Sequence, residues 1–443
     1  MRTIARPRPY QNYVYGYPHK TAYRPLADRP VLDELWAGEP KDALSLYAHI
    51  PFCEYRCGFC NLFTRVGAPE DLTGRYLDAL ERQARAVRAA LGPGPVRFAA
   101  AAFGGGTPTF LNAVELERLC DIAELRMGAD LREIALSVET SPSTATADRL
   151  AVLAERGATR LSIGVQSFVD AEARAAVRPQ RRAEVEAALE RIRAVDIPIL
   201  NIDLIYGIDG QTERSWLTSL DAALAWRPEE LYLYPLYVRP LTGLGRTQLG
   251  SEADWDEQRL RLYAIGRDHL LDNGYEQTSM RMFRRVGAAA SGPDDYACQT
   301  DGMIGLGCGA RSYTAGLHYS FDYAVETREV RGIIDAYTET VDFTRAEVGR
   351  RMDEHEARRR HLLQSLLQAR GMEIAEYHAR FGGTPHEHFP AELAEFEELG
   401  WLATGTGPDL LRLSPEGLAY SDALGPRLFS PEVHAAMAAY EAK

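Results

Sequence analysis

The chain has 443 residues and a net charge of −13, from 50 lysines and arginines against 63 aspartates and glutamates. Hydrophobic residues make up 46% of it, and its apolar runs are shorter than the ~18 residues that cross a bilayer, which excludes a membrane span. The acidic balance disfavours nucleic acid and anionic lipid as partners, because their phosphates need a basic surface. No apolar core follows the arginines of residues 1–11, so we expect no secretory signal and a cytoplasmic protein.

The N-terminal stretch is rich in tyrosine. Residues 10–18 read Tyr-Gln-Asn-Tyr-Val-Tyr-Gly-Tyr-Pro. Aromatic rings bury large apolar areas while keeping a polar tip, so such a stretch suits a segment that lies on another part of the protein. We expect residues 1–45 to form a leader that covers the main domain on the side of its substrate; packing on the outside of that domain is the alternative.

From residue 46 to about 240, short apolar and β-branched runs alternate with stretches of helical period. This pattern predicts repeated βα units around a parallel sheet, hence an α/β fold. Six units can be counted, which favours an open, partial (β/α)6 barrel with its functional groups at the carboxyl ends of the strands. The predicted strands are Ser45–Ile50, Val96–Phe103, Glu133–Glu139, Arg160–Val165, Ile199–Ile205 and Glu230–Leu236.

The remainder of the chain divides into two further regions. Residues 241–350 are expected to extend the barrel, with a helix at 254–272 closed by Asn273-Gly274 and then an irregular, glycine-rich stretch to about residue 320. Residues 351–443 are expected to form a small helical domain of winged-helix type, with helices at 353–370, 374–381 and 391–399 and a wing from 401–404 and 410–413. This last region is rich in glutamate, so a structural or substrate-covering role is favoured over DNA binding.

Three cysteines lie close together after the first predicted strand, in the run Cys53-Glu54-Tyr55-Arg56-Cys57-Gly58-Phe59-Cys60. Three thiolates on one short loop suit an iron–sulfur cluster with one open iron, which the amino and carboxylate groups of a small molecule can chelate. The alternatives are a structural zinc ion or three unrelated thiols. Zinc needs a fourth ligand close by, and the nearest, His49, lies in the strand before the loop.

This loop, Cys-x3-Cys-x-aromatic-Cys after a first strand, resembles the radical S-adenosylmethionine (SAM) superfamily. Four further segments resemble the branch that contains oxygen-independent coproporphyrinogen III dehydrogenase, haem chaperones and the class C radical SAM methyltransferases. They are Tyr47-Ala48-His49-Ile50-Pro51-Phe52-Cys53, Gly104-Gly105-Gly106-Thr107-Pro108, Ser162-Ile163-Gly164-Val165-Gln166-Ser167-Phe168 and Asn201-Ile202-Asp203-Leu204-Ile205-Tyr206-Gly207. The resemblance covers roughly residues 10–425 and is strongest from 46 to 240.

The resemblance implies a [4Fe-4S] cluster, SAM on its fourth iron, and reductive cleavage of SAM to a 5'-deoxyadenosyl radical that abstracts hydrogen. The implied cluster ligands are Cys53, Cys57 and Cys60. The implied SAM contacts are Tyr47, Phe59, Gly104, Gly105, Gly106, Thr107, Glu139, Gln166, Arg178 and Asp203. Among them Phe59 is placed near the adenine and Arg178 near the SAM carboxylate, and the glycines permit a close backbone approach to the methionyl group.

One position departs from the pattern of the coproporphyrinogen dehydrogenases, which carry a fourth cysteine where this chain has Leu62. This favours a specialised enzyme that acts on a small molecule, with methyl transfer by way of a second SAM as the preferred outcome. Oxidative decarboxylation of a coproporphyrinogen-like substrate and a haem chaperone without turnover are the alternatives. An electron donor such as flavodoxin or ferredoxin is implied as partner.

Three other groups are candidates for the substrate side. Residues 299–310 carry closely spaced glycines and correspond, in relatives, to a stretch at the barrel mouth where a second SAM can bind. Cys298 precedes this stretch and Cys308 lies within it, and each is either a thiol hydrogen donor or redox partner, or an unreactive buried thiol. Arg281, Arg284 and Arg285 could bind an anionic substrate there, with a solvated face as the alternative. No catalytic residue on the substrate side can be named.

Overall fold

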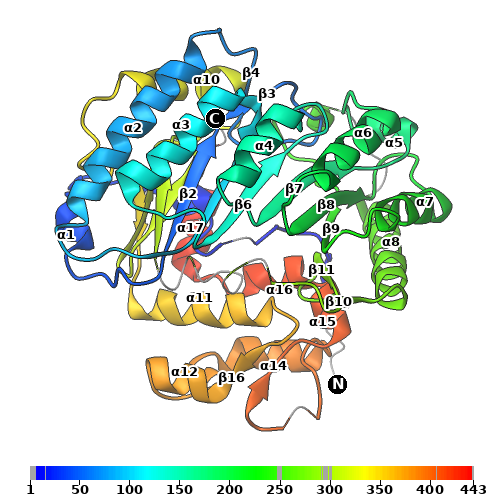
Figure 1. Ribbon diagram of the computed structural model, residues 1–443. Coiled ribbons are helices and arrows are strands. Elements are labelled where there is room, and N and C mark those ends of the chain that lie inside the picture. The colour runs from blue at the N-terminus through cyan, green and yellow to red at the C-terminus, as the bar shows by residue number, and fades with distance from the viewer. Residues whose placement is uncertain are drawn as a thin grey trace.

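The computed structural model describes residues 6–14, 16–246, 252–290, 292, 298, 302–405 and 407–441. Of the predicted segments, Tyr15 and residues 299–301 lie outside this description. In Figure 1 an α/β layer occupies the upper part of the molecule, and a layer of helices from the C-terminal region lies beneath it. No helix among the described residues has the length and hydrophobicity that a bilayer crossing requires.

The six predicted βα units are confirmed. Six strands run parallel in the order of the chain, with their helices on the outer face (Figure 1). The strands are β2 (Leu44–Ile50), β5 (Phe98–Gly105), β6 (Ala135–Thr140), β7 (Arg160–Gln166), β8 (Ile199–Tyr206) and β9 (Glu230–Pro235). The helices between and after them are α2 (Leu72–Ala90), α3 (Ala113–Asp121) with η3 (Ile122–Met127), α4 (Ala147–Glu155), α5 (Asp170–Ala175), α6 (Arg182–Arg193), α7 (Glu213–Leu224) and α8 (Glu252–Asp272).

The sheet is wider than the sequence pattern predicts, since it contains 13 strands. Beyond β9 come β11 (Met282–Arg285) and β10 (Tyr275–Gln277), both antiparallel. On the other side β12 (Met303–Leu306) pairs parallel with β2, so the expectation of an irregular stretch to residue 320 is wrong. The strands outside β12 are β13 (Arg311–Tyr313), β14 (Leu317–Ser320), β15 (Val348–Arg351) and β1 (Arg24–Pro25). Because β1 and β10 end the sheet and do not pair, the barrel stays open.

The C-terminal region is helical, but its last helices return to the barrel. The predicted wing is present: Leu402 and Leu413 form an antiparallel bridge, and the Ala403 N–H donates to Arg412 O over 3.0 Å. The second wing strand also pairs with residues 372–373. Its elements are α11 (Glu354–Leu366), β16 (Met372–Glu373), α12 (Ile374–Phe381), α13 (Pro385–His388), α14 (Pro390–Glu398), β17 (Leu410–Leu411), α15 (Pro415–Ala419), α16 (Ser421–Arg427) and α17 (Pro431–Ala438). Helix α17 packs on η1 (Lys20–Ala22), so the C-terminal helices and the N-terminal segment meet beside the barrel.

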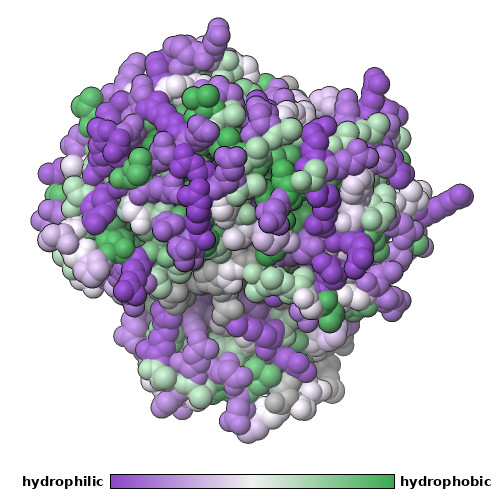
Figure 2. Space-filling view, in the orientation of Figure 1, coloured by the Kyte–Doolittle hydropathy of each residue, from purple (hydrophilic) through white to green (hydrophobic). Residues whose placement is uncertain are grey.

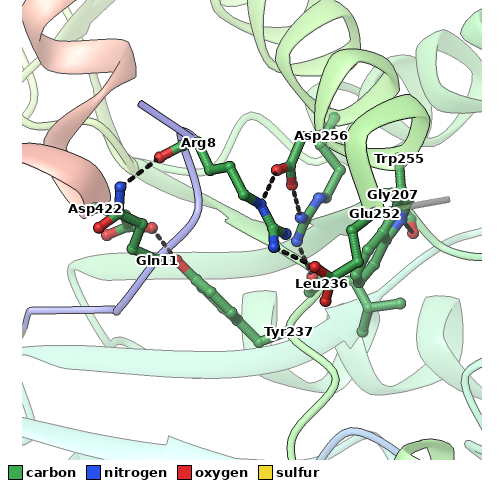
Figure 3. A network of polar contacts seen from close by, with 10 residues as sticks. Arg8, Gln11, Gly207, Leu236, Tyr237, Glu252, Trp255, Asp256 and Asp422 are labelled. Carbon is green, nitrogen blue, oxygen red and sulfur yellow. Dashed lines mark hydrogen bonds and ion pairs between the residues drawn. The ribbon is translucent and has the colours of Figure 1, made fainter. Parts of the chain in front are cut away.

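The N-terminal segment is held by hydrogen bonds and ion pairs to α8 and α16 (Figure 3). The Arg8 guanidinium donates to Asp256, 2.8 Å away, and to Glu252, both on α8. The backbone N–H of Asn12 donates to the carbonyl of Asp422 on α16, over 3.2 Å. These anchors hold residues 8–12 beside the carboxyl end of β9, where the functional side chains of a parallel barrel gather.

A small second core lies under the cysteine loop. Most buried side chains form one continuous cluster, but Ala176, Ile205, Ile208, Leu236 and Leu244 form another, with Phe59 packed against it. These residues follow α5, β8 and β9, so three barrel connections support the loop. The remaining elements are β3 (Phe52–Cys53), β4 (Arg65–Val66), η2 (Pro108–Phe110), α1 (Leu32–Trp36), η4 (Leu244–Arg246) and α10 (Thr327–Glu339).

Candidate functional site

A cavity of about 1080 Å³ opens at the carboxyl ends of the barrel strands. Twelve of the thirteen residues implied by the resemblance line it: Tyr47, Cys53, Cys57, Phe59, Cys60, Gly105, Gly106, Thr107, Glu139, Gln166, Arg178 and Asp203. Gly104 does not line the cavity, but a Cβ there would come within 3.1 Å of the Glu139 carboxyl carbon, so the glycine makes room for that side chain. The structure therefore brings together residues that are spread over more than 150 positions of the sequence.

The glycine loop, residues 104–107 at the end of β5, is hydrogen-bonded to β2 and to the start of the cysteine loop. The Gly106 N–H donates to Ile50 O over 2.8 Å, and the Thr107 N–H donates to Phe52 O over 2.8 Å. A Cβ on Gly106 would lie 2.6 Å from Phe52 O, so only glycine permits this approach. The cysteine loop and the glycine loop thus form one rigid corner of the cavity.

The three cysteines of the loop all face this cavity and are partly exposed. Burial raises the pKa of Cys53 to about 12 and that of Cys60 above its usual value, so without a metal these thiols stay protonated. The Arg178 guanidinium donates to the sulfur of Cys57 over 3.1 Å. Metal binding would displace the protons.

Within the described residues, no three Cys, His, Asp or Glu side chains converge on one metal-ion position. The loop is therefore not closed around a single ion such as zinc. In a [4Fe-4S] cluster each cysteine binds a different iron, so the three sulfurs stand further apart than the ligands of one ion. Three thiols on one cavity wall, with open space in front of them, fit that donor set.

Two carboxylates, Glu139 on β6 and Asp203 on β8, line the cavity wall formed by the central strands. Burial raises the pKa of Glu139 to about 7 and that of Asp203 to about 6. Glu139 accepts from the Gly105 N–H over 3.0 Å, and Asp203 accepts from the Asn201 amide over 2.7 Å. The Asn201 amide oxygen is buried and has no hydrogen-bond partner among the described residues. Asn201 itself does not line the cavity, whereas the two carboxylates do, and carboxylates on a cavity wall fit a ligand that carries a positive charge and hydroxyl groups.

A break in strand register turns Gln166 toward the cavity. The pairing of β7 with β8 shifts between Gly164 and Gln166, and Gln166 has a φ of +70°. Such bulges re-aim a side chain at the end of a strand. The backbone carbonyl of Gly164 in turn accepts from Arg178, so the same irregular strand end orients both side chains.

The second glycine-rich stretch packs on the first strand through His49. This histidine is buried, which lowers its pKa to about 4, and its Nε2 lies 3.0 Å from Phe63 O. A Cβ on Gly309, whose φ is +96°, would lie 2.7 Å from the His49 ring. Residues 302–310 are thus part of the barrel wall, and His49 is a structural group.

Replacing Gly309 with alanine is expected to destabilise the protein by about 2–4 kcal/mol, because the new methyl group meets His49 at a backbone angle that L-residues avoid. Gly316 is the matched control, since a Cβ there meets nothing within 4 Å. The midpoint of urea unfolding measures both variants, and an equal shift in the two would contradict the packing argument.

The two ends of the chain, and segments between them, supply cavity side chains that the sequence did not single out. Lys20 of the N-terminal segment, Arg239 after β9 and Arg311 of β13 bring cationic side chains to the cavity. The C-terminal region adds Phe429 and, from α17, Met437. The expected leader therefore does reach the cavity, with Tyr13 lying edge-on to Tyr234 at 6.1 Å between ring centroids. Only the three-dimensional packing places these groups together.

The prediction that Arg281, Arg284 and Arg285 line the barrel mouth is wrong. All three are ion-paired within the protein: Arg281 with Asp422, Arg284 with Glu230, and Arg285 with Glu229. None of them lines the cavity. Of the two other thiols, Cys298 lines the cavity, whereas Cys308 is buried beside the Tyr76 hydroxyl.

Comparisons with known proteins agree with this arrangement. A family model described as the radical SAM superfamily matches residues 47–223. The heme chaperone HemW of Bacillus subtilis is 31% identical over 280 residues, which cover 61% of this chain and 71% of that protein. The oxygen-independent coproporphyrinogen III oxidase of Paracoccus denitrificans is 34% identical over 280 residues, which cover 61% of this chain and 60% of that oxidase.

The likeness in fold extends further than the likeness in sequence. The coproporphyrinogen III oxidase HemN of Escherichia coli, a radical SAM enzyme, superimposes with a TM-score of 0.78 and 22% identity. That alignment covers 94% of this chain and 96% of the oxidase chain. The common architecture therefore includes the terminal segments that complete the cavity.

Proposed function

Because the chain belongs to the radical SAM superfamily, in the branch of the coproporphyrinogen III oxidases and the heme chaperone HemW, we propose that it is an enzyme that cleaves SAM to modify a carboxylate-bearing small molecule. When bound, a [4Fe-4S] cluster supplies the electron that splits SAM into methionine and a 5'-deoxyadenosyl radical, which abstracts hydrogen from the substrate. The observation that carries the proposal is the single cavity that twelve of the implied ligands share.

The chain's own residues have separable tasks in this proposal. Cys53, Cys57 and Cys60 hold three irons, and the glycine loop offers backbone groups to the methionyl end of SAM. Glu139 and Asp203 hold the ammonium or the ribose hydroxyls. The aromatic residues on the same cavity, such as Tyr13, exclude water from the reacting groups.

SAM binding is expected to weaken at acid pH. Below their pKa values of about 7 and about 6, Glu139 and Asp203 are protonated in the free protein and no longer attract a cationic ligand. We expect affinity for SAM to fall about tenfold between pH 8 and pH 6, as measured by equilibrium dialysis. In Glu139→Gln the affinity should be low at both values and the slope with pH smaller. An affinity for SAM that is constant between pH 8 and pH 6 would contradict the assignment of Glu139 and Asp203 to SAM binding.

Charge and aromatic surface on the cavity support an anionic, ring-containing substrate. Lys20, Arg239 and Arg311 come from three separate parts of the chain and reach the same cavity. Guanidinium and ammonium groups bind carboxylates strongly when the site is shielded from water. The substrate would lie between these cations and the cysteine loop.

The reaction outcome that we favour is methyl transfer with a second SAM. Leu62, which stands where the coproporphyrinogen dehydrogenases carry a further cysteine, argues against the decarboxylation of the haem pathway. The named oxidase relatives and the cavity cations support oxidative decarboxylation of a coproporphyrinogen-like substrate as the second candidate. The relative named as a heme chaperone supports a third, haem binding without turnover.

One experiment distinguishes methyl transfer, oxidative decarboxylation and haem binding without turnover. The protein is reconstituted with iron and sulfide without oxygen, reduced with dithionite in the presence of SAM, and the adenosyl products are identified by mass spectrometry. We expect 5'-deoxyadenosine, and S-adenosylhomocysteine or methylthioadenosine beside it indicates methyl transfer. Release of carbon dioxide from added coproporphyrinogen III would instead support decarboxylation. Intact SAM together with stoichiometric haem binding would refute the enzyme proposal in favour of the chaperone.

A further inference from the structure

Three chain segments meet at one point of the cysteine loop, Gly58. Its N–H donates to Ala176 O over 3.0 Å, and its carbonyl accepts from the Leu244 N–H over 2.7 Å. A Cβ on Gly58 would lie 2.8 Å from the Val177 side chain, and a Cβ on Gly243 would lie 3.1 Å from the Gly58 Cα. The turn after α5 and the loop after β9 therefore rest directly on the loop that carries Cys57.

Both of these covering segments expose a large apolar side chain. Val177 is 51% exposed and Leu241 is 39% exposed. Together with Leu62, these are three of the eight large hydrophobic side chains that the described residues expose; Leu62 and Leu241 also line the cavity, whereas Val177 does not. The face in Figure 2 is largely hydrophilic, with hydrophobic residues in separate patches. Exposed apolar groups that gather at one functional loop mark an interaction site more often than scattered ones do.

The backbone at these two residues is strained. Val177 has a φ of +51° and Leu241 a φ of +66°, and neither is glycine. A β-branched residue in this region is a genuine outlier, and such strain concentrates at functional sites. The tight packing on Gly58 holds Val177 in place while its side chain stays in solvent.

This surface is also connected to the cluster ligands over a very short path. Val177 is the neighbour of Arg178, whose guanidinium lies 3.1 Å from the sulfur of Cys57. Gly58, which Val177 covers, is the next residue after Cys57. Electron transfer between proteins slows steeply with distance, so a donor seated on Val177 would be well placed to deliver an electron to a cluster on this loop.

The charge of the surface identifies the kind of partner. Arg174 and Arg181 are exposed and lie on either side of Val177 in the sequence, and neither guanidinium group forms an ion pair among the described residues. The Glu184 carboxylate accepts from the backbone N–H of Arg181 over 2.8 Å. The adjacent Arg182, in contrast, is paired with Glu186 at 2.7 Å. Unpaired cations around an apolar centre, on a chain whose net charge is −13, are complementary to an acidic protein.

We propose that Arg174, Val177, Arg181 and Leu241, here called the Gly58 surface, dock an acidic one-electron carrier protein. The inference rests on the proposed function, because it requires a cluster at the three cysteines. In the docked complex one electron leaves the reduced carrier and enters the oxidised cluster, so the carrier is oxidised by one electron and no proton is exchanged.

The test compares two charge-reversal variants of the reconstituted protein. Arg174→Glu/Arg181→Glu changes the Gly58 surface, and neither residue lines the cavity. Arg97→Glu/Arg227→Glu makes the same charge change at exposed residues that precede β5 and β9, at the opposite end of the barrel. The binding constants of a flavodoxin and of a [2Fe-2S] ferredoxin are measured by biolayer interferometry for each protein. Cleavage of SAM is followed with each reduced carrier and, separately, with dithionite.

We expect the Gly58-surface variant to bind its carrier at least about tenfold more weakly, and the control variant to change by less than about twofold. Wild-type binding should weaken with added salt, because exposed charges are screened. Cleavage with dithionite should be the same in all three proteins, since a small reductant needs no docking. The carrier that binds the wild type more tightly identifies the donor class.

Equal carrier affinity in the two variants would overturn the docking proposal. A loss of dithionite-driven SAM cleavage in the Gly58-surface variant alone would also overturn it, because Arg174 and Arg181 would then support the cavity site itself. A wild-type protein that does not cleave SAM with dithionite would instead refute the proposed function. The two failures are therefore distinguishable.

Discussion

Replacing Cys57 with alanine is expected to abolish both the iron–sulfur absorbance of the reconstituted protein and its cleavage of SAM. In the proposed cluster each of the three loop thiolates would bind a different iron, so the loss of one would leave a cluster with two protein ligands. Loss of a group that only supports a ligand commonly lowers metal affinity about 10–100-fold, and removal of the ligand itself should exceed that. Absorbance spectra and iron content, measured before any turnover, report on the cluster independently of activity.

Cys120→Ala is the matched control for this prediction. Cys120 lies in α3, is fully buried, and does not line the cavity. Its removal should cost only a small amount of stability and leave iron content, absorbance and SAM cleavage as in the wild type. If Cys57→Ala kept its iron and still cleaved SAM, the assignment of the loop to a cluster would be wrong.

The strands of the barrel could be predicted from sequence because each is a local signal. A parallel strand that is covered on both faces needs a short, continuous apolar run, as in β8, where seven of eight residues are buried. The edge strands carry no such signal. Strand β12 has only four residues, two of them glycine and methionine, and it is a strand because β2 offers its open edge. Pairing of this kind depends on what lies next to a segment in space.

The same distinction explains which parts of the site could be predicted. The cysteine loop and the glycine loop are local motifs, and each strand end contributes its polar residue at a position that the barrel fixes. Lys20, Arg239 and the residues of α17 reach the cavity only because the two ends of the chain fold back on it. The tyrosine-rich run and the glutamate-rich C-terminal region predicted covering roles for the two ends, but no spacing in the sequence indicates which of their side chains reach the cavity.

The error at Arg281 has a physical cause as well. Three arginines within five residues resemble an anion site, but the sequence does not show which carboxylates will lie opposite them. In the structure β11 pairs with β9, which places Arg284 opposite Glu230, and α16 brings Asp422 to Arg281. These arginines form ion pairs within the protein, and the cationic side chains at the cavity come from other segments.

Replacing Asp422 with alanine is expected to be the most destabilising single change outside the cavity, at about 3–5 kcal/mol. Asp422 and Arg281 are 1% and 7% exposed, so the guanidinium would remain buried without its partner. The Tyr237 hydroxyl, which donates to the same carboxylate, would also lose its acceptor. The remaining contact, the Tyr13 ring 4.0 Å from the guanidinium carbon, cannot replace a negative charge.

A double variant distinguishes the loss of attraction between Arg281 and Asp422 from the cost of leaving Arg281 buried without a counter-charge. Because a buried ion pair replaced by hydrophobic residues of similar size is often neutral in stability, Arg281→Met/Asp422→Leu should recover most of the loss. The two single variants and the double variant form a cycle whose coupling energy is measured by urea unfolding. A coupling near zero would mean that the pair does not hold α16 to the barrel. A large coupling would mean that the cavity wall formed by Tyr237 and Tyr13 depends on a contact between β11 and the C-terminal helices.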